Sequence, residues 1–150
     1  GRFARVGHPV VHYQHRGVAK SLLRCYYRMA DVMLVTPFKD GMNLVAKEFV
    51  ACHDDGSGAL VLSEFAGAAA ELDEAYLCNP FDIESVKRAL LNAVRALSDA
   101  PSTMTQRMLT MHDQVISHDV QLWSQSFLGC LRAVRTESAS QAPDSHGKDS

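Results

Sequence analysis

The residues whose types are best suited to ligand binding or catalysis lie in one stretch, from Asp40 to Glu48. Asn43 is suited to cap a helix that begins at Leu44, which would leave the first amides of that helix without acceptors inside it. Free amides and the helix dipole favour an anion such as a phosphate. Gly41 would let a ligand approach the backbone closely. Asp40 can accept hydrogen bonds from sugar hydroxyls, and Glu48, about one turn into the helix, could accept from both hydroxyls of a ribose.

The alternative interpretation of this stretch is a capped helix that is preceded by a turn and binds nothing. The residues alone favour this alternative, because most capped helices have no ligand. The surrounding elements and motifs therefore have to decide between the two interpretations.

The hydrophobic pattern predicts the elements that carry the stretch. Continuous or β-branched apolar runs are typical of strands, and they occur at Val10–Tyr13, Val32–Val35, Ala59–Leu62 and Ala75–Cys78. Of these, Val32–Val35 and Ala59–Leu62 are predicted to be buried on both faces, as in a parallel sheet. Apolar spacing of about 3.6 predicts helices at Ala19–Ala30, Leu44–His53, a long helix that Asp82 caps, and Pro101 to about Val134. The apolar face of the long helix is predicted to be Ile83, Val86, Leu90, Val94 and Leu97.

Strands and helices therefore alternate, which predicts an α/β fold with a Rossmann-like open parallel sheet. Ligands of such folds lie beyond the carboxyl ends of the strands. This rule points to the Thr36–Asn43 loop, to the Ser63–Gly67 loop and to the region after Tyr13. The stretch from Ser63 to Leu72 is predicted to be a loop or a short helix. The domain is expected to cover residues 1–135, and residues 136–150 lack apolar periodicity and are predicted to form a disordered tail.

Three motifs identify a family. The segments VTPFKDGMNLVAKE (35–48), LSEFAGA (62–68) and LCNPFD (77–82) closely resemble the signature of trehalose-6-phosphate synthases, and the likeness runs from about Gly1 to Leu131. The resemblance implies a retaining glycosyltransferase of GT-B architecture, with two Rossmann-like domains and the site between them. It also implies that this chain is most of the C-terminal, donor-binding half, with the start of that domain upstream of Gly1.

The resemblance implies a reaction and a set of site residues. The family transfers glucose from a nucleoside diphosphate glucose to glucose-6-phosphate, giving trehalose-6-phosphate, and needs no metal or other cofactor. By resemblance Asp40 is the catalytic residue and binds the transferred glucose together with the backbone that follows it. The amides from Leu44 onward hold the diphosphate, Glu48 binds the ribose, and the segment near Val18 faces the base. The implied substrate-binding residues are Val18, Asp40, Gly41, Met42, Asn43, Leu44, Val45, Ala46, Lys47 and Glu48.

The resemblance further implies parts that lie outside this chain. An Arg and Lys pair that stabilises the leaving diphosphate is expected upstream of Gly1, and the acceptor residues are expected in an N-terminal domain. We therefore expect that the chain alone does not catalyse transfer. Two alternatives stay open: a non-catalytic module that binds nucleotide sugars, and an inactive remnant that does not fold stably. An apolar helix face around Trp123 and Phe127 also leaves room for a homo-oligomer.

Composition excludes several classes of protein. The chain has 150 residues, with 15 Lys and Arg against 17 Asp and Glu and a formal net charge of -2, which argues against a nucleic-acid binder. No apolar run approaches the roughly 18 residues that span a bilayer, and no secretory signal is visible. The expected location is the cytoplasm.

The cysteines, histidines and methionines give no metal site by spacing. Four widely spaced cysteines without a CxxC pair argue against zinc and indicate reduced thiols, some of them buried. His8, His12 and His15 would suit a metal only on a helix, and Pro9 argues against a helix there. Other side chains are predicted to be surface or helix-end residues (His53, His112 and His118) or core residues (Met104, Met108 and Met111).

Overall fold

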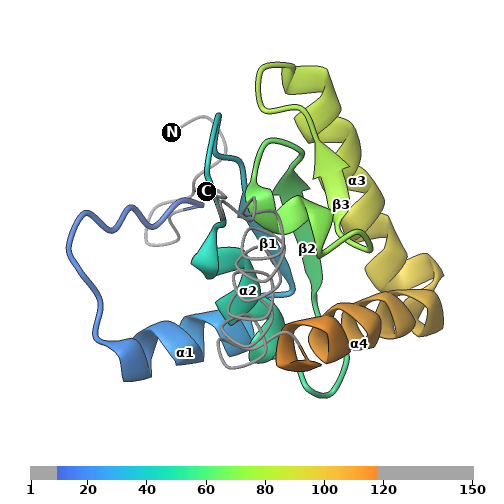
Figure 1. Cartoon of the computed structure of the whole chain (residues 1–150), viewed down its shortest axis with the longest axis horizontal. Helices are drawn as coiled ribbons and strands as arrows, with labels where there is room; N and C mark the ends of the chain where they lie inside the picture. The colour runs from blue at the N-terminus through green and yellow to red at the C-terminus, as the bar shows by residue number, and fades with distance from the viewer. Residues whose placement is uncertain (1–9, 118–150) are drawn as a thin grey trace, which may run out of the picture.

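The computed structural model describes residues 10–117 (Figure 1). Strand β2 (Ala59–Ser63) lies at the centre of a parallel sheet, between β1 (Val32–Val35) and β3 (Tyr76–Cys78). Val32 pairs with Ala59, and Ser63 pairs with Cys78. All of β2 is buried, and its side chains alternate between two separate core clusters, one on each face of the sheet. The predicted α/β fold with an open parallel sheet is confirmed.

Helices cover both faces of this sheet. Helix α2 (Leu44–Ala51) packs on one face and α3 (Ile83–Asp99) on the other, and α4 (Pro101–Ser117) contacts both helices. Helix α4 runs below the sheet in Figure 1, next to Gly56 in the turn that precedes β2. It therefore lies at the amino ends of the strands and leaves the loops at the carboxyl ends uncovered by α4.

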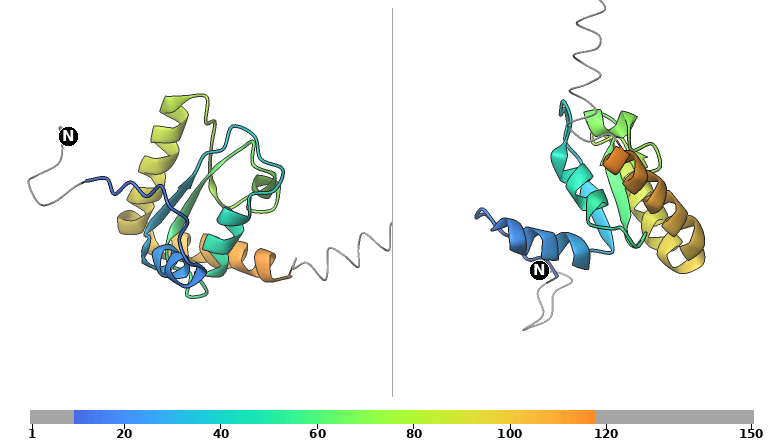
Figure 2. Two further views of the ribbon diagram at one scale, coloured as in Figure 1. Left: turned by 90° about the vertical axis from the view of Figure 1, so that its left-hand side faces the viewer. Right: turned by 60° about the horizontal axis from the view of Figure 1, so that its bottom comes forward.

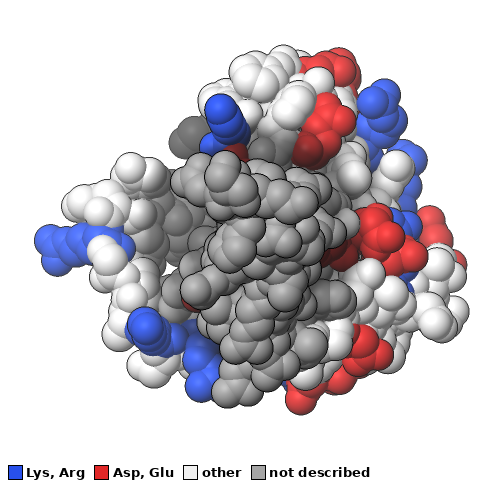
Figure 3. All heavy atoms as spheres, in the orientation of Figure 1, with Lys and Arg blue, Asp and Glu red and all other residues white. Residues whose placement is uncertain are grey.

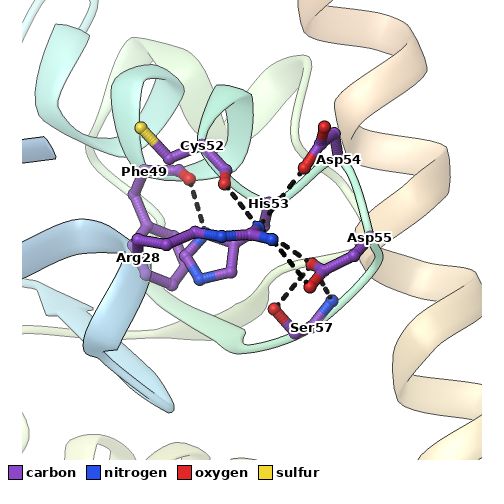
Figure 4. A network of polar contacts seen from close by, with 7 residues as sticks. All are labelled: Arg28, Phe49, Cys52, His53, Asp54, Asp55 and Ser57. Carbon is purple, nitrogen blue, oxygen red and sulfur yellow. Dashed lines mark hydrogen bonds and ion pairs between the residues drawn. The ribbon is translucent and has the colours of Figure 1, made fainter. Parts of the chain in front are cut away.

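Helix α1 (Lys20–Met29) stands to one side of the sheet and packs against α2 (Figure 2). Arg28 connects α1 to the turn after α2 (Figure 4). Its Nη1 donates to the carbonyl of Cys52 at 2.8 Å and lies 3.3 Å from the carboxylate of Asp54. The guanidinium also forms two hydrogen bonds with Asp55, at 3.0 and 2.9 Å. The backbone amide and hydroxyl of Ser57 donate to the same carboxylate.

The predicted first strand is wrong. Residues 10–13 form no strand, and Val10, Val11 and Tyr13 are exposed. A strand needs a neighbouring strand for its backbone hydrogen bonds, and within residues 10–117 the sheet consists of β1, β2 and β3 alone. Instead, the ring of Tyr13 stacks on that of His15, with the ring centroids 6.2 Å apart.

Two burial predictions are also corrected. Leu34 on β1 is exposed, so this strand is not buried on both faces, because α3 packs chiefly on β2 and β3. On α3 itself, Ile83 and Val94 are exposed, whereas the small residues Ala89 and Ala93 are buried against the sheet. The short side chains let the helix approach the strands closely. A prediction that relies on large apolar residues does not place these alanines on the buried face.

Other predicted elements are confirmed. Asp82 caps α3 through a hydrogen bond from the amide of Glu84 to its Oδ1, at 3.0 Å. A short 3₁₀ helix, η1 (Gly67–Ala70), follows β2 where a loop or short helix was expected. The methionines Met104, Met108 and Met111 are all core residues, as predicted.

Several expectations fall outside the described residues. The continuation of the last helix from 118 to about 134, the 1–135 domain boundary and the tail at 136–150 are among them. The predicted apolar helix face around Trp123 and Phe127 lies there too. His8, one of three histidines whose spacing would suit a metal only on a helix, also lies outside the described residues.

On the face in Figure 3, acidic and basic side chains are interspersed over the right half, towards α3 and α4. Basic side chains stand out at the left, on the side of α1. Within residues 10–117, none of the helices combines the length and the apolar character that a membrane crossing requires.

Candidate functional site

The loops that follow β1 and β2 join each other at the carboxyl edge of the sheet. The backbone amide of Asp40 donates to the carbonyl of Phe65 at 3.3 Å, and the amide of Gly67 donates back to the carbonyl of Asp40 at 2.9 Å. The amide of Ala68 donates to the carbonyl of Met42 at 2.7 Å. These bonds continue the parallel pairing of β1 and β2 as a bridge between Asp40 and Ala66. The two loops that the sequence indicated are therefore one structural unit.

Gly67 makes this close approach possible. A Cβ atom at this position would lie 2.1 Å from the carbonyl oxygen of Gly41, which no side chain can tolerate without backbone movement. At Gly41, in contrast, an added Cβ would meet nothing within 4 Å. The predicted open approach to the backbone at Gly41 therefore fits the structure, whereas the requirement at Gly67 was not recognised from the sequence.

Asn43 begins α2 and connects it to Asp40. Its backbone is left-handed, with φ of 72°, a conformation that Asn adopts more easily than most residues. Its side-chain oxygen accepts from the amide of Ala46 at 2.9 Å, so the predicted helix cap is present. Its side-chain nitrogen donates to Oδ2 of Asp40, also at 2.9 Å. One residue thus defines the start of the helix and the direction of the carboxylate before it.

The carboxylate of Asp40 is held in its charged form. The backbone amide of Met42 donates to Oδ1 at 3.0 Å, and this bond, followed by the one from Asn43, lowers the pKa of Asp40 below its usual value. An ionised carboxylate has about four acceptor positions, and these two bonds occupy two of them. The remaining positions can accept hydrogen bonds from a ligand.

The amides of Leu44 and Val45 lie in the first turn of α2, where no carbonyl within the helix can accept from them. Both residues are exposed. The amide of Ala46 is already used by the cap, and the side chain of Lys47 forms a 2.7 Å ion pair with Glu71. Of the predicted diphosphate-binding amides, those of Leu44 and Val45 are thus the ones best placed for an anion.

Glu48 lies one turn further along α2 and is fixed from α1. The hydroxyl of Tyr27, a buried residue, donates to Oε2 of Glu48 at 3.1 Å. Burial, followed by the hydrogen bond and the charge of Glu48, raises the pKa of Tyr27 to about 12. The ring of Tyr27 packs edge-on against Phe49. The sequence pattern predicts a helix at Ala19–Ala30 but does not indicate this contact, because the contact depends on how α1 crosses α2.

Glu48 and Tyr27 border a hollow of about 330 Å³ between α1 and α2, which Lys20 and Cys52 also line. Val18 is half-buried and lies two residues before the start of α1. The structure therefore brings together Asp40, the amides of α2 and Glu48 along one helix. Val18 lies on the neighbouring segment that leads into α1.

His53 was predicted to be a surface or helix-end residue. It directly follows Cys52, the C-cap of α2, so it lies at a helix end, but it is 1% exposed and therefore not a surface residue. Its Nδ1 lies 2.8 Å from the carbonyl of Phe49, so Nδ1 carries the proton and donates. The ring also packs on that of Phe49, next to Gly58. This histidine belongs to the packing below the site.

The described cysteines and acidic side chains form no metal site. No group of three or more His, Cys, Asp or Glu side chains in residues 10–117 is arranged to hold a metal ion. Cys25, Cys52 and Cys78 are free thiols, and burial raises the pKa of Cys78. The fourth cysteine, Cys130, lies outside the described residues.

The family follows from comparison with known proteins. The sequence model described as glycosyltransferase family 20 matches residues 1–133. The chain belongs to this family. It is 52% identical over 144 residues to a trehalose-6-phosphate synthase of Mycobacterium marinum, and 56% identical over 131 residues to one of Mycolicibacterium vanbaalenii. These alignments cover 96% and 87% of the chain but 28% and 26% of the relatives.

Solved structures agree with this assignment. The trehalose 6-phosphate synthase of Burkholderia multivorans matches with a TM-score of 0.80 and 38% identity, over 99% of this chain and 31% of that one. An Escherichia coli structure bound with UDP-2-fluoro glucose matches with a TM-score of 0.78 and 40% identity, over 87% and 28% of the two chains. A Burkholderia xenovorans enzyme in complex with glucose-6-phosphate has a TM-score of 0.78 and 41% identity, over 87% and 29%.

The family-20 chain thus spans under a third of the length of the curated relatives it matches. These relatives are glycosyltransferases that take part in trehalose biosynthesis. The resemblance predicted from the three motifs is therefore confirmed, and the same motifs contain the joined loops at the carboxyl edge of the sheet.

Proposed function

We propose that the protein of which this chain forms a part transfers glucose from a nucleoside diphosphate glucose to glucose-6-phosphate, with retention, and that this chain supplies the donor-binding residues. The observation that carries the proposal is the joined loop in front of α2. It combines an ionised Asp40 with the open first turn of a helix, in a chain whose family is glycosyltransferase family 20.

Asp40 has the chemistry of a sugar-binding group. Its carboxylate is charged and is held by Met42 and Asn43, yet it keeps free acceptor positions. We assign it the hydroxyls of the transferred glucose. Because two donors already fix the carboxylate, binding the sugar would not have to order it again. This rigidity is what a group that orients the reacting sugar requires.

The start of α2 has the chemistry of a diphosphate site. We assign the amides of Leu44 and Val45 to the diphosphate, since the helix dipole and the unpaired amides both favour negative charge. Gly41 leaves space for the ligand beside the backbone. Glu48 would accept from the ribose hydroxyls, with Tyr27 holding its second oxygen.

The ligands of two related structures support the substrate classes. The Escherichia coli protein binds an analogue of UDP-glucose, and the Burkholderia xenovorans protein binds glucose-6-phosphate. By analogy, a nucleoside diphosphate glucose is the donor to test here and glucose-6-phosphate the acceptor. The base would face the segment near Val18.

The rest of the proposal concerns parts and conditions outside the described residues. We propose that the leaving diphosphate is stabilised by an Arg and Lys pair upstream of Gly1, and that an N-terminal domain holds the acceptor. The reaction is proposed to need no metal or other cofactor and to take place in the cytoplasm. We also propose that the protein forms a homo-oligomer.

Calorimetric titration of the purified chain with UDP-glucose and ADP-glucose tests donor binding. We expect saturable binding, weakened by roughly 1–3 kcal/mol in Glu48→Ala, the range for a hydrogen bond to a charged group. Glu48→Gln is the matched variant for the tyrosine contact, because its amide oxygen can still accept from Tyr27. Glu84→Ala, which removes an exposed carboxylate on α3, should bind like the unchanged chain.

The outcomes separate the proposal from its alternatives. Binding without turnover of glucose-6-phosphate would indicate a donor-binding module that needs the rest of the protein for catalysis. No binding by a chain that melts cooperatively would contradict the assignment of the donor to these residues. No cooperative melt would favour the unfolded remnant.

A further inference from the structure

Three exposed phenylalanine rings join all the loops that follow the strands. Phe38 follows β1, Phe65 follows β2 and Phe81 follows β3. The ring centroid of Phe81 lies 4.8 Å from that of Phe38 and 5.6 Å from that of Phe65, tilted to the first and edge-on to the second. Phe81 is therefore the member that touches both other rings.

Core packing does not explain this aromatic cluster of Phe38, Phe65 and Phe81. All three side chains are exposed, Phe81 at 69%, and none belongs to either core cluster on the faces of the sheet. Aromatic pairs at these distances and angles stabilise the segments that carry them. The contacts thus act between loops rather than between a loop and the core.

The cluster adjoins the hydrogen bonds that place Asp40. Phe38 lies two residues before Asp40, and the carbonyl of Phe65 accepts from the amide of Asp40. Two residues after Phe65, the amide of Gly67 donates to the carbonyl of Asp40. The two outer rings therefore flank both sides of the backbone bridge between the loops.

Phe81 itself is anchored to β3. Its amide donates to the side-chain oxygen of Asn79 at 2.9 Å. The carbonyl of Cys78, the last residue of β3, accepts from the amide of Glu64 at 3.0 Å. The loop after β3 thus has a fixed place from which its ring can hold the other two.

We propose that Phe81 is a positioning residue, whose ring keeps the Asp40 loop and the Gly67 loop paired at the carboxyl edge. The consequence for a donor sugar rests on the proposed function, whereas the effect on the loops does not. Phe81 would act through Asp40 and Gly67 and need not touch the ligand.

Hydrogen exchange in the full chain tests this role without a ligand. In Phe81→Ala we expect the amides of Gly67 and Ala68 to exchange roughly two- to tenfold faster, the range for the loss of aromatic pair contacts. The amide of Leu62, in the buried strand β2, should be unchanged. Ile83→Ala is the matched control, since Ile83 is similarly exposed, at 65%, and lies two residues further on. Phe81→Tyr, which keeps the ring, should restore slow exchange.

Two results would overturn the proposal. One is unchanged exchange at Gly67 and Ala68 in Phe81→Ala. The other is equal acceleration at Leu62, because Phe81 would then contribute to general stability. Donor affinity gives a second measurement and should fall several-fold in Phe81→Ala alone. If the unchanged chain binds no donor, the proposed function fails, while the exchange rates still decide the role of Phe81.

Discussion

Asn43 and Gly67 show how much of the candidate site depends on single residues. Asn43 caps α2 with one end of its amide and holds the carboxylate of Asp40 with the other. Gly67 lets the second loop pass directly against the carbonyl of Gly41. The hydrogen bonds from Met42 and Asn43 keep Asp40 charged, because they lower its pKa. Each of these residues acts mainly on the backbone or on another side chain of the site.

Gly67→Ala should disrupt the joined loops. Its Cβ would lie 2.1 Å from the carbonyl oxygen of Gly41, so one loop has to move and the bond from Gly67 to Asp40 is lost. We expect the free energy of unfolding to fall by about 1–3 kcal/mol, in the range for overpacking. Chemical denaturation measures this change.

Gly41→Ala is the matched control for that substitution. An added Cβ meets nothing within 4 Å at Gly41, so the free energy of unfolding should stay within about 0.5 kcal/mol of the unchanged chain. Equal losses from the two substitutions would contradict the assignment of close backbone contact to Gly67 alone.

At the scale of elements, α1 is attached by two side chains one position apart. Tyr27 enters the core and holds Glu48 on α2, while Arg28 binds the turn that follows α2. The carboxylate of Asp55 in that turn accepts from Ser57 and from Arg28. The orientation of Glu48 thus depends on a helix that precedes it by about twenty residues.

The turn after α2 should make stability depend on pH. Bonds from Ser57, followed by those from Arg28, lower the pKa of Asp55 from 3.8 to about 2 in the folded chain. A lowered folded pKa gives stability that is present above pH 3.8 and is lost as the pH falls towards about 2. In Asp55→Asn, the denaturation midpoint should therefore fall less over this interval.

Asp54→Asn provides the control for this pH dependence, since Asp54 makes a single 3.3 Å contact with Arg28. Its denaturation midpoint should follow the same pH profile as the unchanged chain. A profile for Asp55→Asn that also matches the unchanged chain would show that the bonds from Ser57 and Arg28 are not maintained in solution.

Most of these elements are predictable from the sequence, and the errors share a cause. Local patterns place α1, α2, β2 and the cap of α3, because spacing and capping depend on neighbouring residues. The failures at residues 10–13 and at Leu34 depend on which element lies alongside. The contact between Tyr27 and Glu48 and the space at Gly67 likewise arise between distant segments. The motifs contain the loops of the candidate site, but their sequence does not show how these loops are joined.

At the scale of the whole molecule, apolar side chains remain exposed on β1 and on α1. Leu34 on the outer strand β1 and Leu22, Tyr26 and Met29 on α1 are all exposed. Within residues 10–117, the outer edge of β1 has no neighbouring strand. An edge strand with an exposed apolar side chain favours association between chains.

The purified chain should therefore self-associate as its concentration rises. Leu34→Lys places a charge on the outer strand and should lower the average mass that sedimentation measures. Leu91→Lys, an equally charged change at an exposed position on α3, is the control and should leave the mass unchanged. A mass that Leu34→Lys does not alter would place the contact elsewhere.

The backbone contact between Gly67 and Gly41 also has a consequence for sequence variation. The carbonyl group of Gly41 and the hydrogen atoms on the Cα of Gly67 set the distance between the two loops. Side chains at neighbouring exposed positions can therefore change without separating the loops. Tolerance to substitution should then be unequal across the site. Met42 and Leu44, whose exposed side chains do not take part in the loop pairing, can accept many residues, whereas position 67 accepts glycine alone. A library randomised at these three positions would reveal this difference as three distinct spectra of surviving sequences.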